Sequence, residues 1–340
     1  MKQYICIMLA LSLVLCGCTP ALQRTDKQYS TTFLDLFDTV TSIVGFAESK
    51  AAFDAQAQKI HDELLNYHQL FDIYKDYPGI ANLKTVNDQA GIAPVVVDQA
   101  IIALLKDCRR YYELSNGKVN VAMGSVLQLW HIARTDGTRD PEHAALPSMD
   151  ALKEAALHTD FSNVIIDVVA STVYLSDPKM QLDLGAIAKG WAAQRVAASA
   201  PERMLISVGG NVCATSPKMS DGTPWVIGVQ NPDGGDNLHT INVTGGAVVT
   251  SGDYQRVYTV DGKQYHHIID PDTLMPSQLW RSITVVCADS GLADALSTAL
   301  FLLPLAEGQA LAQQCGAEVL WVNAAGEETM TPGFRDMIRT

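Results

Sequence analysis

Short runs of β-branched and apolar residues, separated by turn signals, dominate the chain after residue 163. Runs of about four to eight such residues are typical of strands. The runs that we expect to form strands are 164–169, 172–175, 204–208, 225–229, 247–250, 255–260, 265–269, 283–286 and 318–322. Because these strands follow one another with few helices between them, the pattern disfavours a regular parallel sheet. It predicts an α+β or mixed α/β fold.

Helices are expected where apolar residues recur at helical spacing. These segments are 49–70, 97–114, 149–157, 184–199 and 292–303, and one early strand is expected at 39–46. Asp183 stands where the N-cap of the 184–199 helix would be, and Pro304 follows the 292–303 helix. With 48% hydrophobic residues among 340, the chain can bury a large core.

The N-terminus has the pattern of a secretory signal. Lys2 precedes an apolar run at 4–15, and the run ends in Leu-Cys-Gly-Cys at 15–18. This ending resembles a bacterial lipobox, in which the last Cys is lipidated. We therefore expect residues 1–18 to be a lipoprotein signal peptide, Cys18 to carry the lipid, and 19–30 to be a tether. An ordinary signal peptide with incidental cysteines is the alternative. Either signal directs the protein across the membrane, and the lipid would hold it at the extracytoplasmic face.

The formal net charge is −13, and Lys and Arg are not clustered anywhere in the chain. Nucleic acid is therefore not expected as a partner, because phosphate backbones require clustered cations. An acidic protein that binds a phosphorylated ligand usually needs a metal ion to mediate. The cysteines that would remain after export show no CxxC or Cys/His pattern. We therefore expect no zinc site, and we expect these cysteines to be free, buried thiols.

The segment Gly-Leu-Ala-Asp-Ala-Leu-Ser-Thr at 291–298 is the strongest candidate for a metal site. On a helix, Asp294 and Thr298 share one face and Ser297 lies beside them. A carboxylate with hydroxyl oxygens suits a hard cation such as Mg²⁺. Taken alone, the same pattern could be a helix cap or a solvated surface.

Two further motifs carry groups suited to phosphate chemistry. In Asp-Leu-Gly-Ala-Ile-Ala-Lys-Gly at 183–190, a helix N-terminus and Lys189 could hold an anion. In His-Ile-Ile-Asp-Pro at 267–271, His267 could accept a proton from a hydroxyl at neutral pH. Strand alternation places the neighbouring His266 on the opposite face. Each motif also has a plain structural interpretation: a capping Asp with a surface Lys, and a packed His.

Together with other segments, these motifs resemble those of the ApbE family, in the family's order and at about its spacing. The matching segments are 37–39, 71–74, 116–121, 183–190, 207–211, 225–232, 250–253, 267–271 and 293–298. The resemblance covers about residues 33–330. It implies one flavin-transferase domain at 31–340, with a T-fold-type architecture of mixed sheets and flanking helices around an FAD cleft.

The resemblance implies an FAD:protein FMN transferase that depends on Mg²⁺. In this reaction a threonine hydroxyl of an acceptor flavoprotein attacks the FMN phosphorus of FAD, and AMP leaves. His267 matches the family's proposed base. The metal ligands fall on Asp294, Thr298, Ser297 and the backbone carbonyl of Ala186. The FAD contacts fall on Phe37, Tyr74, Lys118, Val119, Asn120, Asp183, Lys189 and Ile269.

The chain departs from the family pattern at several of these positions. Many members have Met-Gly-Thr where this chain has Phe-Asp-Thr at 37–39, an Asp at the position of Asn120, and an acidic residue at the position of Ser297. Two alternatives use the same residues: an Mg²⁺-dependent FAD pyrophosphatase that gives FMN and AMP, and a non-enzymatic FAD-binding lipoprotein.

Overall fold

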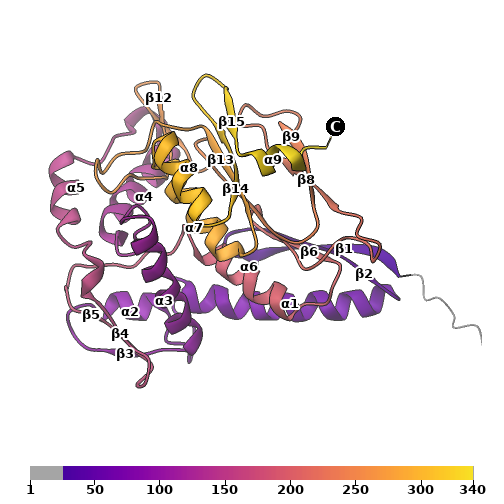
Figure 1. The fold of residues 1–340 in the computed structure, drawn as a ribbon. Coiled ribbons are helices and arrows are strands. Elements are labelled where there is room, and N and C mark those ends of the chain that lie inside the picture. The colour runs from indigo at the N-terminus through magenta and orange to yellow at the C-terminus, as the bar shows by residue number, and fades with distance from the viewer. Residues whose placement is uncertain (1–25, 340) are drawn as a thin grey trace, which may run out of the picture.

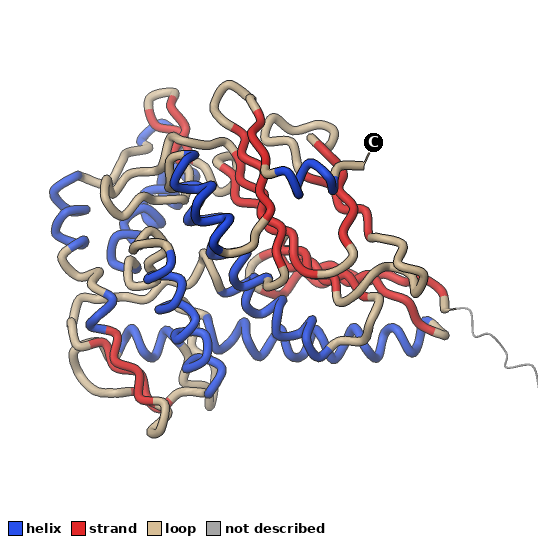
Figure 2. The backbone as a smooth tube through the Cα atoms, in the orientation of Figure 1, coloured by secondary structure: helices blue, strands red, loops and turns tan. Residues whose placement is uncertain are grey.

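A computed structural model describes residues 26–339 (Figures 1 and 2). Its largest element is an eight-stranded sheet in the order β1-β2-β6-β7-β10-β13-β14-β15. Neighbouring strands in it are antiparallel throughout. The strands are β1 (Lys27–Leu36), β2 (Thr39–Ala47), β6 (Met204–Val208), β7 (Asn211–Ala214), β10 (Gly246–Gly252), β13 (Ser282–Cys287), β14 (Glu318–Val322) and β15 (Glu328–Met330).

Both faces of the central part of this sheet are covered, which explains why its central strands are continuous apolar runs. On β10, Ala247 and Val249 pack toward the helices, whereas Val248 packs with the opposite layer. The helices of the first face are α1 (Lys50–Phe71), α6 (Ala188–Ser199), α7 (Ser290–Phe301) and α8 (Leu305–Gln314). The opposite layer consists of the hairpin β8 (Trp225–Val229) and β9 (His239–Val243) with the short helix α9 (Pro332–Met337). Figure 1 shows α1 running along the β1–β2 side of the sheet.

Residues 72–181 form a helical lobe beside the large sheet (Figure 1). The hydrophobic core of this lobe, which includes the inner side chains of α3, is continuous with the core around α7 and α8. The elements of the lobe are α2 (Leu83–Asp88), α3 (Gln99–Leu114), α4 (Gly124–Arg139), α5 (Met149–Ala156), two 3₁₀ turns (Pro141–His143 and Phe161–Asn163) and the sheet of β3 (Val95–Val96), β5 (Thr172–Leu175) and β4 (Val164–Asp167). A separate hairpin, β11 (Tyr258–Val260) with β12 (Lys263–Tyr265), packs on α4.

The predicted α+β class is confirmed, and the strands expected at 172–175, 204–208, 225–229 and 318–322 are found with those bounds. Mixed sheets were also expected, but every ladder between named strands of the described chain is antiparallel. The helix expected from 184 begins only at Ala188, because a turn occupies 184–187. The strand expected at 265–269 ends at Tyr265. The helices α2, α4, α8 and α9 were not predicted.

The folded part of the chain begins earlier than the expected tether allows. Residues 27–30 belong to β1, where Lys27 pairs with Ala47 and Ser30 with Val44. The predicted tether of 19–30 is therefore too long at its C-terminal end, because these residues form a ladder with β2. The signal segment and Cys18 lie outside the described residues. Among residues 26–339, no helix combines the length and apolarity needed to cross a membrane.

The four cysteines of the described chain are free thiols, as predicted. Cys108 and Cys213 are buried, and burial raises the pKa of the Cys213 thiol to about 12. Cys287 and Cys315 are only partly buried, so the expectation of full burial is wrong for these two. None of the four lines the cavity described below.

Candidate functional site

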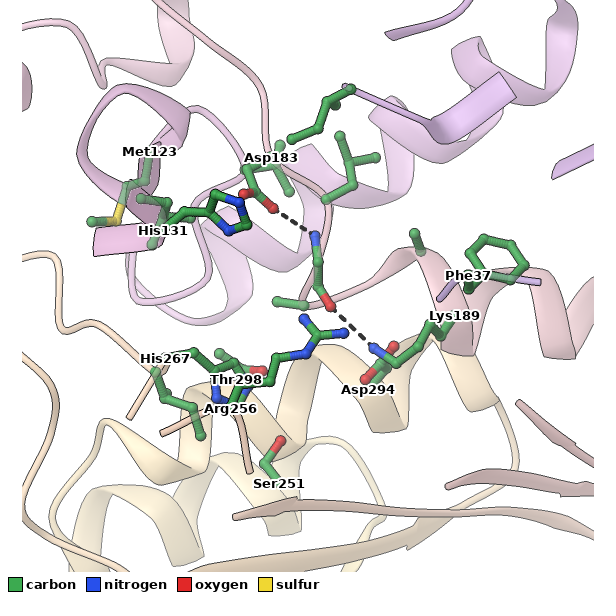
Figure 3. A pocket seen from close by; sticks show the side chains of 18 of the residues that line it. Phe37, Met123, His131, Asp183, Lys189, Ser251, Arg256, His267, Asp294 and Thr298 are labelled. Carbon is green, nitrogen blue, oxygen red and sulfur yellow. Dashed lines mark hydrogen bonds between the residues drawn. The ribbon is translucent and has the colours of Figure 1, made fainter. Parts of the chain in front are cut away.

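A cavity of about 490 Å³ lies between α6, α7 and the helical lobe. Its volume is in the range of small-molecule sites. Every described residue that the sequence analysis assigned to FAD, to proton transfer or to the metal lines it, with the exception of Ser297. The walls come from the β1–β2 turn, the end of α1, α4, the turn before α6, the β10–β11 loop, residues 267–269 and α7. Segments far apart in the sequence therefore meet at one place (Figure 3).

The carboxylate of Asp294 is held at the N-terminus of α6. Its Oδ2 accepts hydrogen bonds from the Gly190 backbone N–H and from Nδ2 of Asn211, each at 2.8 Å. The first N–H groups of a helix lack partners within the helix, and the helix dipole favours a negative charge beside them. Burial raises the pKa of Asp294, while the charge of Lys189 and the two hydrogen bonds act in the opposite direction. Asp294 on α7 thus accepts hydrogen bonds at the start of α6, and these bonds offset part of the cost of burying its carboxylate.

Gly190 is needed for this contact because there is no room for a side chain. A Cβ at this position would lie 2.4 Å from Cβ of Asp294 and 2.4 Å from the carbonyl oxygen of Ser290. Both atoms belong to α7, so the glycine lets the two helices approach closely enough for the Gly190 N–H to reach the carboxylate. The glycine at this end of the 183–190 motif therefore has a packing role that the sequence alone did not show.

The oxygens expected to hold a metal are partly brought together. Among the described residues no donor reaches Oδ1 of Asp294, and Thr298 lines the cavity one turn further along α7. Ala186 lines it from the turn before α6. Within residues 26–339 no three His, Cys, Asp or Glu side chains gather as a metal cluster. One carboxylate, one hydroxyl and one carbonyl make a set of hard oxygen donors that fits Mg²⁺ and does not fit zinc.

Ser297 does not join this set. It is fully buried and does not line the cavity, because its hydroxyl donates to the Asp294 carbonyl at 2.8 Å and bonds to the Ser251 hydroxyl at 2.8 Å. The Ser297 side chain therefore lies between α7 and β10, where it links the Asp294 backbone carbonyl to Ser251. Helical spacing predicted its nearness to Asp294 but not the direction of its side chain.

His267 also lines the cavity. Its Nδ1 lies 3.1 Å from the Gln255 carbonyl oxygen, and this contact requires the proton on Nδ1, which leaves Nε2 as the acceptor. Part of the ring faces the cavity, but protein atoms surround the remainder. Burial, followed by the positive charge of Arg256, lowers the pKa of His267 to about 3. In the absence of ligand the imidazole is neutral at physiological pH.

His266 faces away from the cavity, as strand alternation predicted, although the strand itself ends one residue earlier. It is buried, its Nε2 lies 2.7 Å from the Ser277 carbonyl oxygen, and its Nδ1 accepts the N–H of Ile268 at 3.2 Å. These bonds hold the segment that carries His267. A substitution at His266 is therefore expected to reduce stability and is not a neutral control.

Cations at the cavity differ in whether they are already neutralised. Lys118 bonds to Asp270 at 2.9 Å and Asp272 at 2.8 Å, so its charge is balanced within the protein. Lys189 donates to the Gly185 carbonyl at 3.1 Å. Within the described chain neither Lys189 nor Arg256 forms an ion pair. In Figure 3, Lys189 lies beside Asp294, and Arg256 lies near His267 and Thr298.

Two other predicted FAD contacts use their side chains to shape the cavity wall. Asn120 donates to the Thr159 carbonyl at 2.9 Å and accepts the Ala122 N–H at 2.9 Å. Asp183 is not a helix N-cap, because its Oδ1 accepts the Gly185 N–H at 2.8 Å within the turn before α6. The remaining contacts, Phe37, Tyr74, Val119 and Ile269, present apolar or aromatic surface to the cavity.

A polar group on α4 was not predicted from the sequence. Arg134 donates to Nδ1 of His131 at 3.0 Å, and the Tyr74 ring lies 5.4 Å from the His131 ring. Both α4 residues line the cavity. The four-residue spacing of the buried Val126 and Trp130 is the signal that could have revealed this helix. Arg256 was also missed, because it was expected inside a strand at 255–260, whereas β11 begins only at Tyr258 and Arg256 lies in the loop before it.

Phosphoryl-transfer enzymes work chiefly by positioning a charged substrate and neutralising it, and this cavity provides groups for both tasks. The fold and cavity thus define an enzyme of phosphoryl or nucleotidyl transfer. The sequence pattern of the ApbE family matches residues 37–321, and the chain belongs to that family.

Known relatives agree with this assignment. The chain is 36% identical over 277 residues to the FAD:protein FMN transferase of Treponema pallidum, covering 76% of this chain and 75% of that protein. It is 33% identical over 267 residues to a protein of the same name from Klebsiella pneumoniae, covering 75% and 80%. Among solved structures, the ApbE protein of Thermotoga maritima is similar with a TM-score of 0.81 and 31% identity, covering 92% of this chain and 100% of that one.

Gly190→Ala tests the contact between α6 and α7. We expect it to lower the free energy of unfolding by about 1–3 kcal/mol, because the added methyl overlaps α7. Thermal denaturation should show a fall of several degrees in Tm. The matched control is Gly308→Ala in α8, where a Cβ would be 3.5 Å from Leu300 and has ordinary room. Equal Tm values for the two variants would contradict the packing role.

Proposed function

We propose that the protein is an Mg²⁺-dependent FAD:protein FMN transferase that moves FMN from FAD to a threonine hydroxyl of an acceptor flavoprotein and releases AMP. The names of the curated relatives support this reaction. The observation that carries the proposal is one cavity in which four groups lie together: the buried carboxylate of Asp294, the cations Lys189 and Arg256, which have no ion pair with any described residue, and a neutral His267. Binding alone would not require a proton acceptor beside a phosphate site.

Charge neutralisation is the first task of such a site. The FAD diphosphate is anionic, and Lys189 and Arg256 line the cavity without an ion pair to any described residue, so their charges can meet it. Asp294, Thr298 and the Ala186 carbonyl would hold Mg²⁺, which, when bound, offsets the charge of the diphosphate. The aromatic side chains of Phe37 and Tyr74, which line the cavity, would receive the flavin ring.

The chemical step exchanges one P–O bond for another. The threonine oxygen forms a bond to the FMN phosphorus, the bond from that phosphorus to the bridging oxygen breaks, and AMP leaves with the electron pair. His267 takes the proton of the threonine hydroxyl at Nε2, since Nδ1 is committed to the Gln255 carbonyl. The negative charge of a bound diphosphate would raise the pKa of His267 from its low value in the free enzyme, which makes it a better base when substrate is present.

The test is mass spectrometry of a candidate acceptor after incubation with FAD, Mg²⁺ and this protein. The acceptor should gain the mass of FMN, and AMP should appear in equal amount. FMN and AMP without modified acceptor would indicate a pyrophosphatase, and unchanged FAD would indicate a binding protein.

Asp294→Asn should abolish Mg²⁺-dependent turnover, because it removes the single charged ligand of the set. Asp289→Asn, at the start of the same helix and outside the cavity, is the matched control.

His267→Ala should slow FMN transfer by a factor on the order of 10² to 10⁴ while FAD binds within a few-fold of the parent affinity. Steady-state kinetics and a separate FAD titration measure the two effects. The imidazole limb of the pH profile should lie at higher pH in kcat than in kcat/KM, since only kcat reports the substrate-bound state. His143→Ala, at an exposed position, is the control. A His267 variant that transfers FMN at the parent rate would remove the base from this mechanism.

We also propose that the protein is anchored in the cell membrane by lipid on Cys18 and faces the extracytoplasmic side. The support is the order of Lys2, the apolar run 4–15 and the small residue before Cys18. Cys18→Ala should leave the protein unprocessed or release it from the membrane fraction, as shown by fractionation and lipid labelling. Cys16→Ala is the matched control and should remain lipidated. Normal lipid labelling of the Cys18 variant would contradict the proposal.

A further inference from the structure

His68, in the last turn of α1, lies between two loops that line the cavity. One is the turn between β1 and β2, which carries Phe37, and the other is the segment after α1, which carries Tyr74. Neither the metal set nor the proton transfer uses His68. Its ring packs against both sides: its centroid is 5.5 Å from the Phe37 ring and 6.2 Å from the Tyr77 ring, edge-on in each case.

The hydrogen bonds of His68 have one consistent direction. The backbone N–H of Phe37 donates to Nδ1 of His68 at 3.1 Å, so Nδ1 carries no proton. The proton is then on Nε2, which donates to the Tyr77 hydroxyl oxygen at 3.3 Å. Tyr77 in turn donates to Oδ2 of Asp72 at 2.8 Å. Each group in this chain of bonds has the partner that its chemistry requires.

Asp72 extends the chain of bonds to the Tyr74 loop. Its Oδ1 accepts the backbone N–H of Tyr74 at 2.6 Å and that of Lys75 at 3.1 Å. Burial, followed by the hydrogen bond to Asp72, raises the pKa of Tyr77 to about 12, so its hydroxyl stays protonated and can donate. Three side chains therefore connect the backbone at residue 37 with the backbone at residue 74.

The β1–β2 turn needs such support because its backbone is unfavourable on its own. Phe37 and Asp38 have φ values of +52° and +50°, in the left-handed region that side chains other than glycine rarely adopt. Phe37 nevertheless has to keep its ring at the cavity wall. The bond from its N–H to His68 holds the turn against α1, which is anchored by the hydrophobic core.

We propose that His68 and Tyr77 are positioning residues that join the Phe37 turn and the Tyr74 loop into one prearranged wall for the flavin ring. The proposal rests on the proposed function, in which both aromatic residues contact FAD. The flavin ring is remote from the bonds that change, so its contacts are the same before and during the chemical step. Loss of the wall should therefore weaken FAD binding and leave kcat nearly unchanged.

The test compares His68→Phe, Tyr77→Phe and the double variant by FAD titration and steady-state kinetics. Each single variant should weaken FAD binding about three- to tenfold, the range of one net hydrogen bond, with kcat within about twofold. The second substitution should add little to the first, because both break the same chain of bonds. His68→Asn keeps a side-chain acceptor for the Phe37 N–H and should restore part of the affinity. His61→Phe is the matched control, since His61 is on the same helix but bonds to Asp35 outside the cavity.

A measurement without FAD separates this proposal from the proposed function. Imidazole ¹⁵N NMR of the ligand-free protein should show His68 with its proton on Nε2, assigned by the signals that His68→Asn removes. A proton on Nδ1 would overturn the proposal, as would a His68→Phe variant that lowers kcat at unchanged FAD affinity or that matches His61→Phe in FAD affinity. If the tautomer is as expected but the parent protein neither binds nor cleaves FAD, the proposed function fails while the connection between the two loops remains.

Discussion

The bond between Asp294 and the N-terminus of α6 is the contact on which the rest of the cavity depends. Burial of a carboxylate is costly unless donors surround it. Here the helix end and Asn211 supply those donors. Because Gly190 lets α6 and α7 meet at this point, the position of Lys189 on one helix and of Thr298 on the other is fixed relative to the carboxylate. The residues proposed to hold the metal, Asp294 and Thr298, and the cation Lys189 are thus positioned by the same contact between α6 and α7.

The distribution of ion pairs sets this cavity apart in a protein with a formal net charge of −13. Carboxylates are abundant, and Lys118 at the cavity edge is neutralised by two of them, Asp270 and Asp272. Lys189 and Arg256 have no such partner within the described chain, although both reach the same cavity. An acidic protein that leaves these cations free can attract an anionic ligand at this place and repel it elsewhere.

The sequence predicted the elements better than it predicted the directions of side chains. Strands buried on both faces appear as short apolar runs, so most of the large sheet could be recognised. Asp183 is a good N-cap residue and therefore suggested a helix from 184, but a turn delays the helix to Ala188. Ser297 follows helical spacing, yet its hydroxyl bonds to Ser251 of β10 and does not face the cavity. His131 and Arg134 were missed because α4 was not recognised.

Asp294 and His267 lie in the same cavity, and burial shifts their pKa values in opposite directions. Burial raises the pKa of Asp294 and lowers that of His267, so each is driven toward its neutral form. Under the proposed function, a cation beside Asp294 would favour its ionised form, and a diphosphate beside His267 would strengthen it as a base. The cation would also attract the diphosphate directly. Binding of either ligand should therefore favour binding of the other, and by thermodynamic linkage the effect must be equal in both directions. Proton transfer then becomes efficient only when the cation and the diphosphate are both bound. A site that holds only one of the two ligands would therefore react slowly.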